Sequence, residues 1–219
     1  GVLDGSLLEL ALTSPAGGAA CLSLLGLALI AVGLSFDGPG ARADSELSRS
    51  AAVVGAALVV ASFALTGHTS VSPHRWILAV LLSVHLFIVA WWFGALPPLY
   101  LASLKESPAR AGRIVDRFSS VAAWLVPGIL LAGLAIAALL IANLSVLRRP
   151  YGELLLAKLG GFALLMGLAS LNKWRLAPAI ARAEGGALLA FRLSVAAELA
   201  LIAAVLAVTA VMTTFFSPE

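Results

Sequence analysis

Residues 76–96 read WILAVLLSVHLFIVAWWFGAL, and this stretch decides the fold class of the chain. It carries no acidic residue, lysine or arginine. A helix needs about 20 mostly apolar residues to cross the roughly 30 Å hydrocarbon core of a bilayer, so the stretch is long enough to span one. Further apolar runs lie on both sides of it, separated by short polar segments. The six predicted spans cover residues 16–34, 51–66, 76–96, 118–143, 154–171 and 195–214.

The composition predicts an all-α fold, a polytopic transmembrane helical bundle that lies in a lipid bilayer. Hydrophobic residues make up 61% of the chain and charged residues 11%, against about 25% charged residues in soluble domains. The runs lack the alternation of apolar and polar residues that a membrane β-barrel needs. The run at 51–66 is short for a span, and we expect it either to extend into residues 66–72 or to tilt little in the membrane.

The polar segments are short, so residues 1–219 are predicted to form a single membrane domain. The chain opens at Gly1 and not at a methionine. No basic segment precedes an apolar one at this end, and residues 1–15 are not expected to be a signal peptide. We expect that the chain is part of a longer protein or that earlier residues have been removed.

The distribution of lysine and arginine predicts the orientation of the bundle. With six spans, the segments near 35–50, 103–117 and 172–192 share one side and carry ten basic residues, whereas the side with both termini carries three. Basic residues favour the cytoplasmic side of a membrane. Both termini are therefore predicted to face outward. The ten are Arg42, Arg49, Lys105, Arg110, Arg113, Arg117, Lys173, Arg175, Arg182 and Arg192.

A few polar residues fall inside predicted spans, where such side chains are costly and often functional. Glu198 is expected near the inner end of the last span. There it can pair with Lys173, Arg175 or Arg192, or accept a hydrogen bond from Asn172. We interpret this arrangement as structural.

The residues that could bind a soft metal ion are few. Imidazole suits both oxidation states of copper, and thioether sulfur favours Cu(I). His68 and Met212 are expected at a similar level near the outer face, and His85 about 13 Å into its span, near the middle of the membrane. Met166 is expected to be a packing residue. These residues predict a path for a metal ion, with His68, His85 and Met212 as candidate ligands.

A series of short motifs runs through the chain in a specific order. Gly67-His68 is followed by His85 and by the sequence WFGAL at 92–96, and Thr13–Gly17 precedes them. Later motifs are Arg117-Phe118-Ser119, residues 151–155 with Lys158, Asn172 with Trp174, and Arg192 with Glu198. This order resembles the copper-resistance membrane protein family named CopD or PcoD over nearly the whole chain. Ala95 stands where that family has a second glycine.

The resemblance implies a protein of the bacterial inner membrane that moves copper ion from the periplasm to the cytoplasm. Both termini of this chain would be periplasmic, and a periplasmic copper-binding protein of the CopC type would be a partner. His68 would capture the ion with His74 as a helper, and His85 would relay it. The resemblance also implies that two N-terminal spans of the family pattern are missing. We expect a transporter and not an enzyme.

Two other functions are compatible with the sequence. A haem b protein, such as a membrane metal reductase, would clamp the haem iron between two histidines of adjacent helices, but His68 and His85 are expected at different depths. A structural or assembly subunit of a membrane complex would use the same histidines for packing. A nucleic-acid partner is not expected, because the net charge is only +3 and no basic stripe interleaved with aromatic residues is present.

Overall fold

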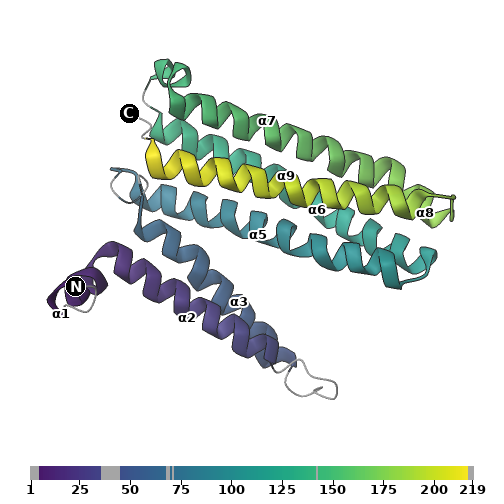
Figure 1. Ribbon diagram of the computed structural model, residues 1–219, viewed down its shortest axis with the longest axis horizontal. Helices are drawn as coiled ribbons and strands as arrows, with labels where there is room; N and C mark the ends of the chain where they lie inside the picture. Colours follow the sequence, from purple (N-terminus) through teal and green to yellow (C-terminus); the bar gives the residue numbers. More distant parts are fainter. Residues whose placement is uncertain (1–4, 36–44, 68–69, 71, 142, 217–219) are drawn as a thin grey trace. The chain divides into compact units, whose positions relative to one another are not determined.

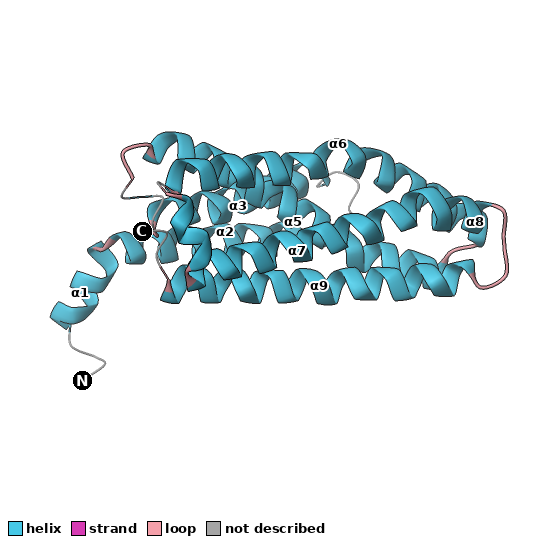
Figure 2. Cartoon of the chain, turned by 90° about the horizontal axis from the view of Figure 1, so that it is seen from above, coloured by secondary structure: helices cyan, strands magenta, loops and turns pink. Residues whose placement is uncertain are grey.

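The computed structural model describes the chain except for residues 1–4, 36–44, 68–69, 71, 142 and 217–219. Every regular element in the described part is a helix (Figures 1 and 2). Six of its helical segments are long and apolar enough to cross a membrane. The chain is therefore an all-α, multi-pass membrane protein, as predicted. The six segments are Pro15–Ser35, Glu46–Leu65, Arg75–Lys105, Pro108–Leu140, Pro150–Ala181 and Ala187–Phe215.

The helices are longer than the predicted spans. Helix α5 (Arg75–Lys105) contains Pro97 and Pro98 and continues past them. A proline removes only the hydrogen bond to the carbonyl one turn earlier, and membrane helices tolerate that loss. Helix α6 (Pro108–Leu140) begins at a proline, a residue favoured in the first helical position because its missing N–H is not needed there. Most of the predicted polar segment 103–117 is consequently helical.

The short second span gains its length at its N-terminal end. Helix α3 runs from Ser45 to Ser62, and a 3₁₀ turn, η1, covers Phe63–Leu65. The backbone at Thr66 is already extended. The predicted extension into residues 66–72 is therefore not where the helix lengthens.

The described chain divides into two compact units. The first comprises residues 1–87 together with 132–140, and the second comprises 88–131 together with 141–219. Helices α5 and α6 contribute to both. The predicted organisation as a single membrane domain stays a prediction.

In the first unit, α1 (Gly5–Thr13) leads into α2 (Pro15–Ser35), which lies alongside α3 (Figure 1). The backbones of α2 and α3 approach closely at two glycines, because a Cβ on Gly26 would lie 2.5 Å from the carbonyl oxygen of Gly55, and the reverse holds too. Small residues allow this kind of close contact between membrane helices. Two serine contacts support it: Ser23 and Ser62 hydroxyls lie 2.7 Å apart, and the Ser48 hydroxyl donates to the Gly33 carbonyl at 2.7 Å.

In the second unit, α7 (Pro150–Leu171) and α9 (Ala187–Phe215) lie side by side (Figures 1 and 2). A 3₁₀ turn, η2 (Leu144–Arg148), precedes α7, and a π-helical segment, η3 (Asn172–Leu176), leads from α7 into the short α8 (Ala177–Ala181). The apolar core joins α5, α6, α7 and α9 around Trp92, Leu96, Val126, Leu165 and Phe191. Stacking of Trp91 on Phe118, with ring centroids 5.2 Å apart, adds to the contact between α5 and α6.

Candidate functional site

The structure describes two of the three predicted histidines, and both belong to the first unit. His68 lies outside the described residues. His74 is exposed and immediately precedes α5, where its carbonyl accepts from the Leu78 amide at 3.0 Å. His85 lies eleven residues further along the chain, on α5, which separates the two by about 16 Å along the helix axis. His74 and His85 therefore cannot bind one metal ion together.

His85 is half-buried, and its ring lies against α6. A Cβ placed on Gly133 of α6 would lie 3.3 Å from the His85 Cε1 atom and 3.5 Å from Nδ1. The distance to Cε1 is short for a carbon contact, so the absence of a side chain at Gly133 makes room for the imidazole. The first unit thus holds an imidazole between two spanning helices.

The sulfur residues are dispersed. Met212 is 5% exposed and packs in a small apolar cluster with Val146 and Tyr151. Met166 packs against the core of the second unit, and Cys21 is exposed on α2. Within the part of the chain that the structure describes, no three His, Cys, Asp or Glu residues come together as a metal site. The assignment of His68, His74, His85 and Met212 as copper ligands stays a prediction.

A haem group does not fit the described histidines. Axial ligation needs two side chains on opposite faces of one iron, and His74 and His85 occupy one stretch of chain about 16 Å apart.

A different polar centre lies in the second unit, between α7 and α9. The side-chain amide of Asn172 donates from Nδ2 to the Oε1 atom of Glu198 at 2.5 Å. The indole of Trp92, on α5, is also hydrogen-bonded to Glu198. The Asn172 and Glu198 residues are 7% and 2% exposed. Of the partners expected for Glu198, Asn172 is therefore confirmed.

Arg192 has another partner. Its guanidinium donates to the backbone carbonyl of Ser103 through Nη2 and to the Ser103 hydroxyl through Nε at 3.2 Å. Arg192 precedes Glu198 by six residues, which places the two side chains about 240° apart around the helix. Arg192 accordingly ties α9 to α5 near the end of both helices and leaves Glu198 to neutral partners.

Asn172 is the first residue of the π segment η3. Such segments are rare, and they occur frequently at functional sites because the wider turn re-aims side chains. Here Asn172 is directed to Glu198, and the following Lys173 lines the same cavity. The sequence indicates Glu198 as a polar residue within a span and Asn172 as one of its possible partners. It did not identify Trp92 as their partner or the π segment, for which the sequence offers no signal.

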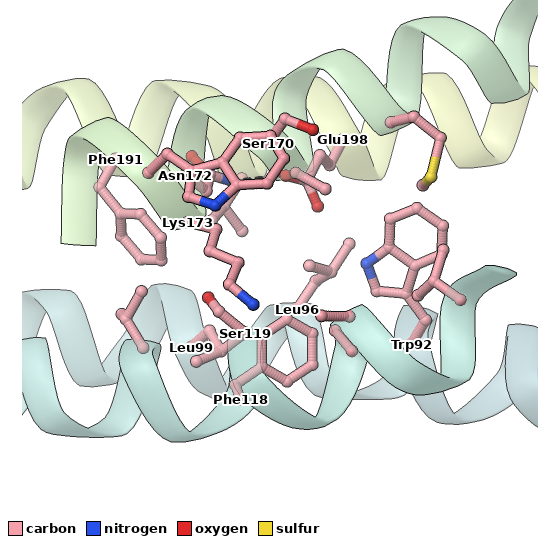
Figure 3. Close-up of a pocket in the computed structure, with 18 of the residues that line it drawn as sticks. Trp92, Leu96, Leu99, Phe118, Ser119, Ser170, Asn172, Lys173, Phe191 and Glu198 are labelled. Carbon is pink, nitrogen blue, oxygen red and sulfur yellow. Dashed lines mark hydrogen bonds between the residues drawn. The ribbon is translucent and has the colours of Figure 1, made fainter.

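The centre opens into a cavity of about 260 Å³. Figure 3 shows Asn172, Glu198 and Trp92 at its wall, with the side chain of Lys173 extending toward Ser119 and Phe118. Most of the remaining wall is apolar, with Leu96, Leu99, Val126, Phe191 and Val195 among its residues. A mainly apolar cavity with a few converging polar groups is the usual form of a small-ligand site.

Comparison with known proteins shows a similarity over part of the chain. Residues 112–212 match the family described as CopD, copper resistance protein D. The chain is 32% identical over 137 residues to a protein named copper resistance protein D from Pseudomonas syringae pv. tomato. That match covers 58% of this chain and 44% of the relative, so the chain spans less than half of the relative's length. No solved structure matches the chain. Residues 112–212 are thus similar to the copper resistance protein D family.

Proposed function

We propose that the chain transports copper across the bacterial inner membrane, from the periplasm to the cytoplasm, and that it is not an enzyme. A periplasmic copper-binding protein of the CopC type would deliver the ion. The similarity to copper resistance protein D supports a role in copper handling. The observation that carries the proposal is the imidazole of His85, held within a spanning helix and accommodated by Gly133 of the next helix.

The chemistry of the imidazole supports this role. A histidine ring binds either oxidation state of copper through a neutral nitrogen. Placed within a span, it offers the ion a ligand in a region where water and polar side chains are scarce. His68, His74 and Met212 would act nearer the outer face, where the ion enters.

The charge distribution supports a periplasmic location for the outer-face residues. The side that carries ten basic residues is proposed to be cytoplasmic, which makes both termini of this chain periplasmic. Residues 67–75, with His68 and His74, would then face the periplasmic partner.

The proposal is tested with His68→Ala, His85→Ala and the double variant, with Met166→Leu as control. Copper accumulation by cells and copper bound per purified protein are measured side by side. His68→Ala should weaken capture, and His85→Ala should reduce accumulation to the vector background while leaving capture largely intact. If the double variant is inserted at the parent level and accumulates copper as the parent does, the proposed transport route is wrong.

A further inference from the structure

Glu198 is a carboxyl group buried in the middle of an apolar core, twelfth in the 29 residues of α9. It lies about 17 Å along the helix from the first residue and is 2% exposed. Its hydrogen-bond partners, Asn172 and Trp92, are neutral donors. A buried carboxylate without a cation is costly, and such a group often remains protonated instead.

The charged groups around Glu198 are few. The cavity residues contributed by α5 and α6 include no ionisable side chain. Lys173 of η3 lines the cavity, whereas Arg192 is engaged with Ser103. The salt bridges among the described residues are Arg110–Glu106 and Arg182–Glu184, so Glu198 takes part in none of them. Lys173 is therefore the cation placed to approach Glu198 through the cavity.

Two buried oxygen atoms near Glu198 have no hydrogen-bond partner in the described part of the chain. They are the Oδ1 atom of Asn172 and the hydroxyl of Ser194, which lies one helical turn before Glu198. Leaving a buried acceptor without a donor destabilises the folded state. A carboxylate cannot supply the donor, but a protonated carboxyl can donate its O–H to an amide oxygen while it accepts from the amide nitrogen. Water can supply it too, because the adjoining cavity is large enough to hold water molecules.

We propose that Glu198, Asn172 and the adjoining cavity form a proton-binding site, and that proton uptake and release there is coupled to the passage of copper. The coupling rests on the proposed transport function. A proton passes from a hydronium ion in the cavity to the Glu198 carboxylate and leaves a water molecule, with no change of oxidation state. In the protonated state the carboxyl donates to Asn172. In the deprotonated state the ammonium group of Lys173 compensates the charge.

The first experiment measures the proton directly, without copper. Infrared difference spectra of the purified full chain in lipid nanodiscs are recorded between acid and alkaline pH. We expect the carbonyl band of a protonated buried carboxyl group that shifts in heavy water and is absent in Glu198→Gln. Glu153→Gln, which alters an exposed carboxylate on α7, is the matched control and should leave the band unchanged.

A second variant addresses the hydrogen bonds of the site. Trp92→Phe removes one donor to Glu198, so the same band should persist but move to higher frequency, because a carbonyl with fewer donors has a stiffer bond. This result would hold even if Glu198→Gln failed to fold. If no band of the parent responds to pH, or if the responding band is unaffected by both variants, Glu198 is not a proton-binding site.

The second experiment measures the coupling. Copper uptake into proteoliposomes is followed with and without a proton gradient. The gradient should alter the initial rate for the parent and for Glu153→Gln, whereas Glu198→Gln should give the same rate in both conditions. A gradient response in Glu198→Gln equal to that of the parent would overturn the coupling. If the parent transports no copper at all, the proposed function fails, and the infrared band still decides whether Glu198 binds a proton.

Discussion

At the residue scale, the contact between His85 and Gly133 is the most sensitive part of the proposed copper route. A methyl group at Gly133 would lie 3.3 Å from the His85 Cε1 atom, so the imidazole or the α6 backbone must shift by a few tenths of an ångström. Overpacking of this kind costs about 1–3 kcal/mol. We predict that Gly133→Ala lowers copper uptake while the protein remains inserted, because the ring loses its position.

Gly160→Ala is the matched control for this variant. Gly160 lies within a spanning helix, and a Cβ there would meet nothing within 4 Å. Uptake rates are compared at equal amounts of inserted protein. Equal losses in both variants would indicate a general effect of alanine on these helices, and unchanged uptake in Gly133→Ala would show that the position of the His85 ring does not matter.

The pair Asn172–Glu198 shows what can be predicted from single residues. Glu198 is an acidic residue within a predicted span, Asn172 directly follows another, and their hydrogen bond was among the expected partnerships. The alternative with Arg192 fails because six residues of an α-helix turn the side chains to different faces. The part played by Trp92 was not predictable, since an indole in an apolar run gives no sign that its N–H has a partner on another helix.

At the scale of the helices, α2 and α3 depend on two facing glycines. A Cβ on Gly26 would meet the Gly55 carbonyl oxygen at 2.5 Å, whereas one on Gly18 of the same helix would meet nothing within 4 Å. We predict that Gly26→Ala lowers the thermal unfolding midpoint of the purified protein and that Gly18→Ala does not, as followed by helical circular dichroism in detergent.

The double variant sharpens the prediction about these helices. Once Gly26→Ala has pushed α2 and α3 apart, Gly55→Ala should cost less than it does alone, because the two substitutions disturb one contact. Strictly additive losses would mean that the glycines act independently. A midpoint for Gly26→Ala equal to that for Gly18→Ala would show that this close approach does not stabilise the protein.

Element types were predictable from the sequence, but their ends were not. Hydropathy identified all six spans of the described chain, because an apolar run of sufficient length has few alternatives to a helix in lipid. It missed the polar first turns of α6, which are helical although they lie outside the apolar run. Helix α5 also continues through Pro97 and Pro98, since neighbouring helices in a membrane can offset what a proline removes.

At the scale of the whole molecule, the sequence predicts an orientation, and the second unit adds a constraint on it. A Cβ on Gly112, near the start of α6, would lie 3.4 Å from the Ala181 backbone at the end of α8. The connections that contain Ser107 and Glu184 therefore lie at the same end of this unit. Ser145, in η2 before α7, lies one spanning helix away from each of them.

The final prediction concerns this orientation. Single cysteines are introduced at Ser107, Glu184 and Ser145 after Cys21, the one cysteine of the chain, has been changed to serine. Ten basic residues on one side predict that positions 107 and 184 are cytoplasmic. A membrane-impermeant thiol reagent should label Ser145→Cys in intact spheroplasts and should label Ser107→Cys and Glu184→Cys only after permeabilisation. Labelling of both latter positions from outside would invert the orientation, and with it the proposed periplasmic entry at His68 and His74. Labelling of one without the other would contradict the arrangement of the second unit itself, because both connections lie at the same end.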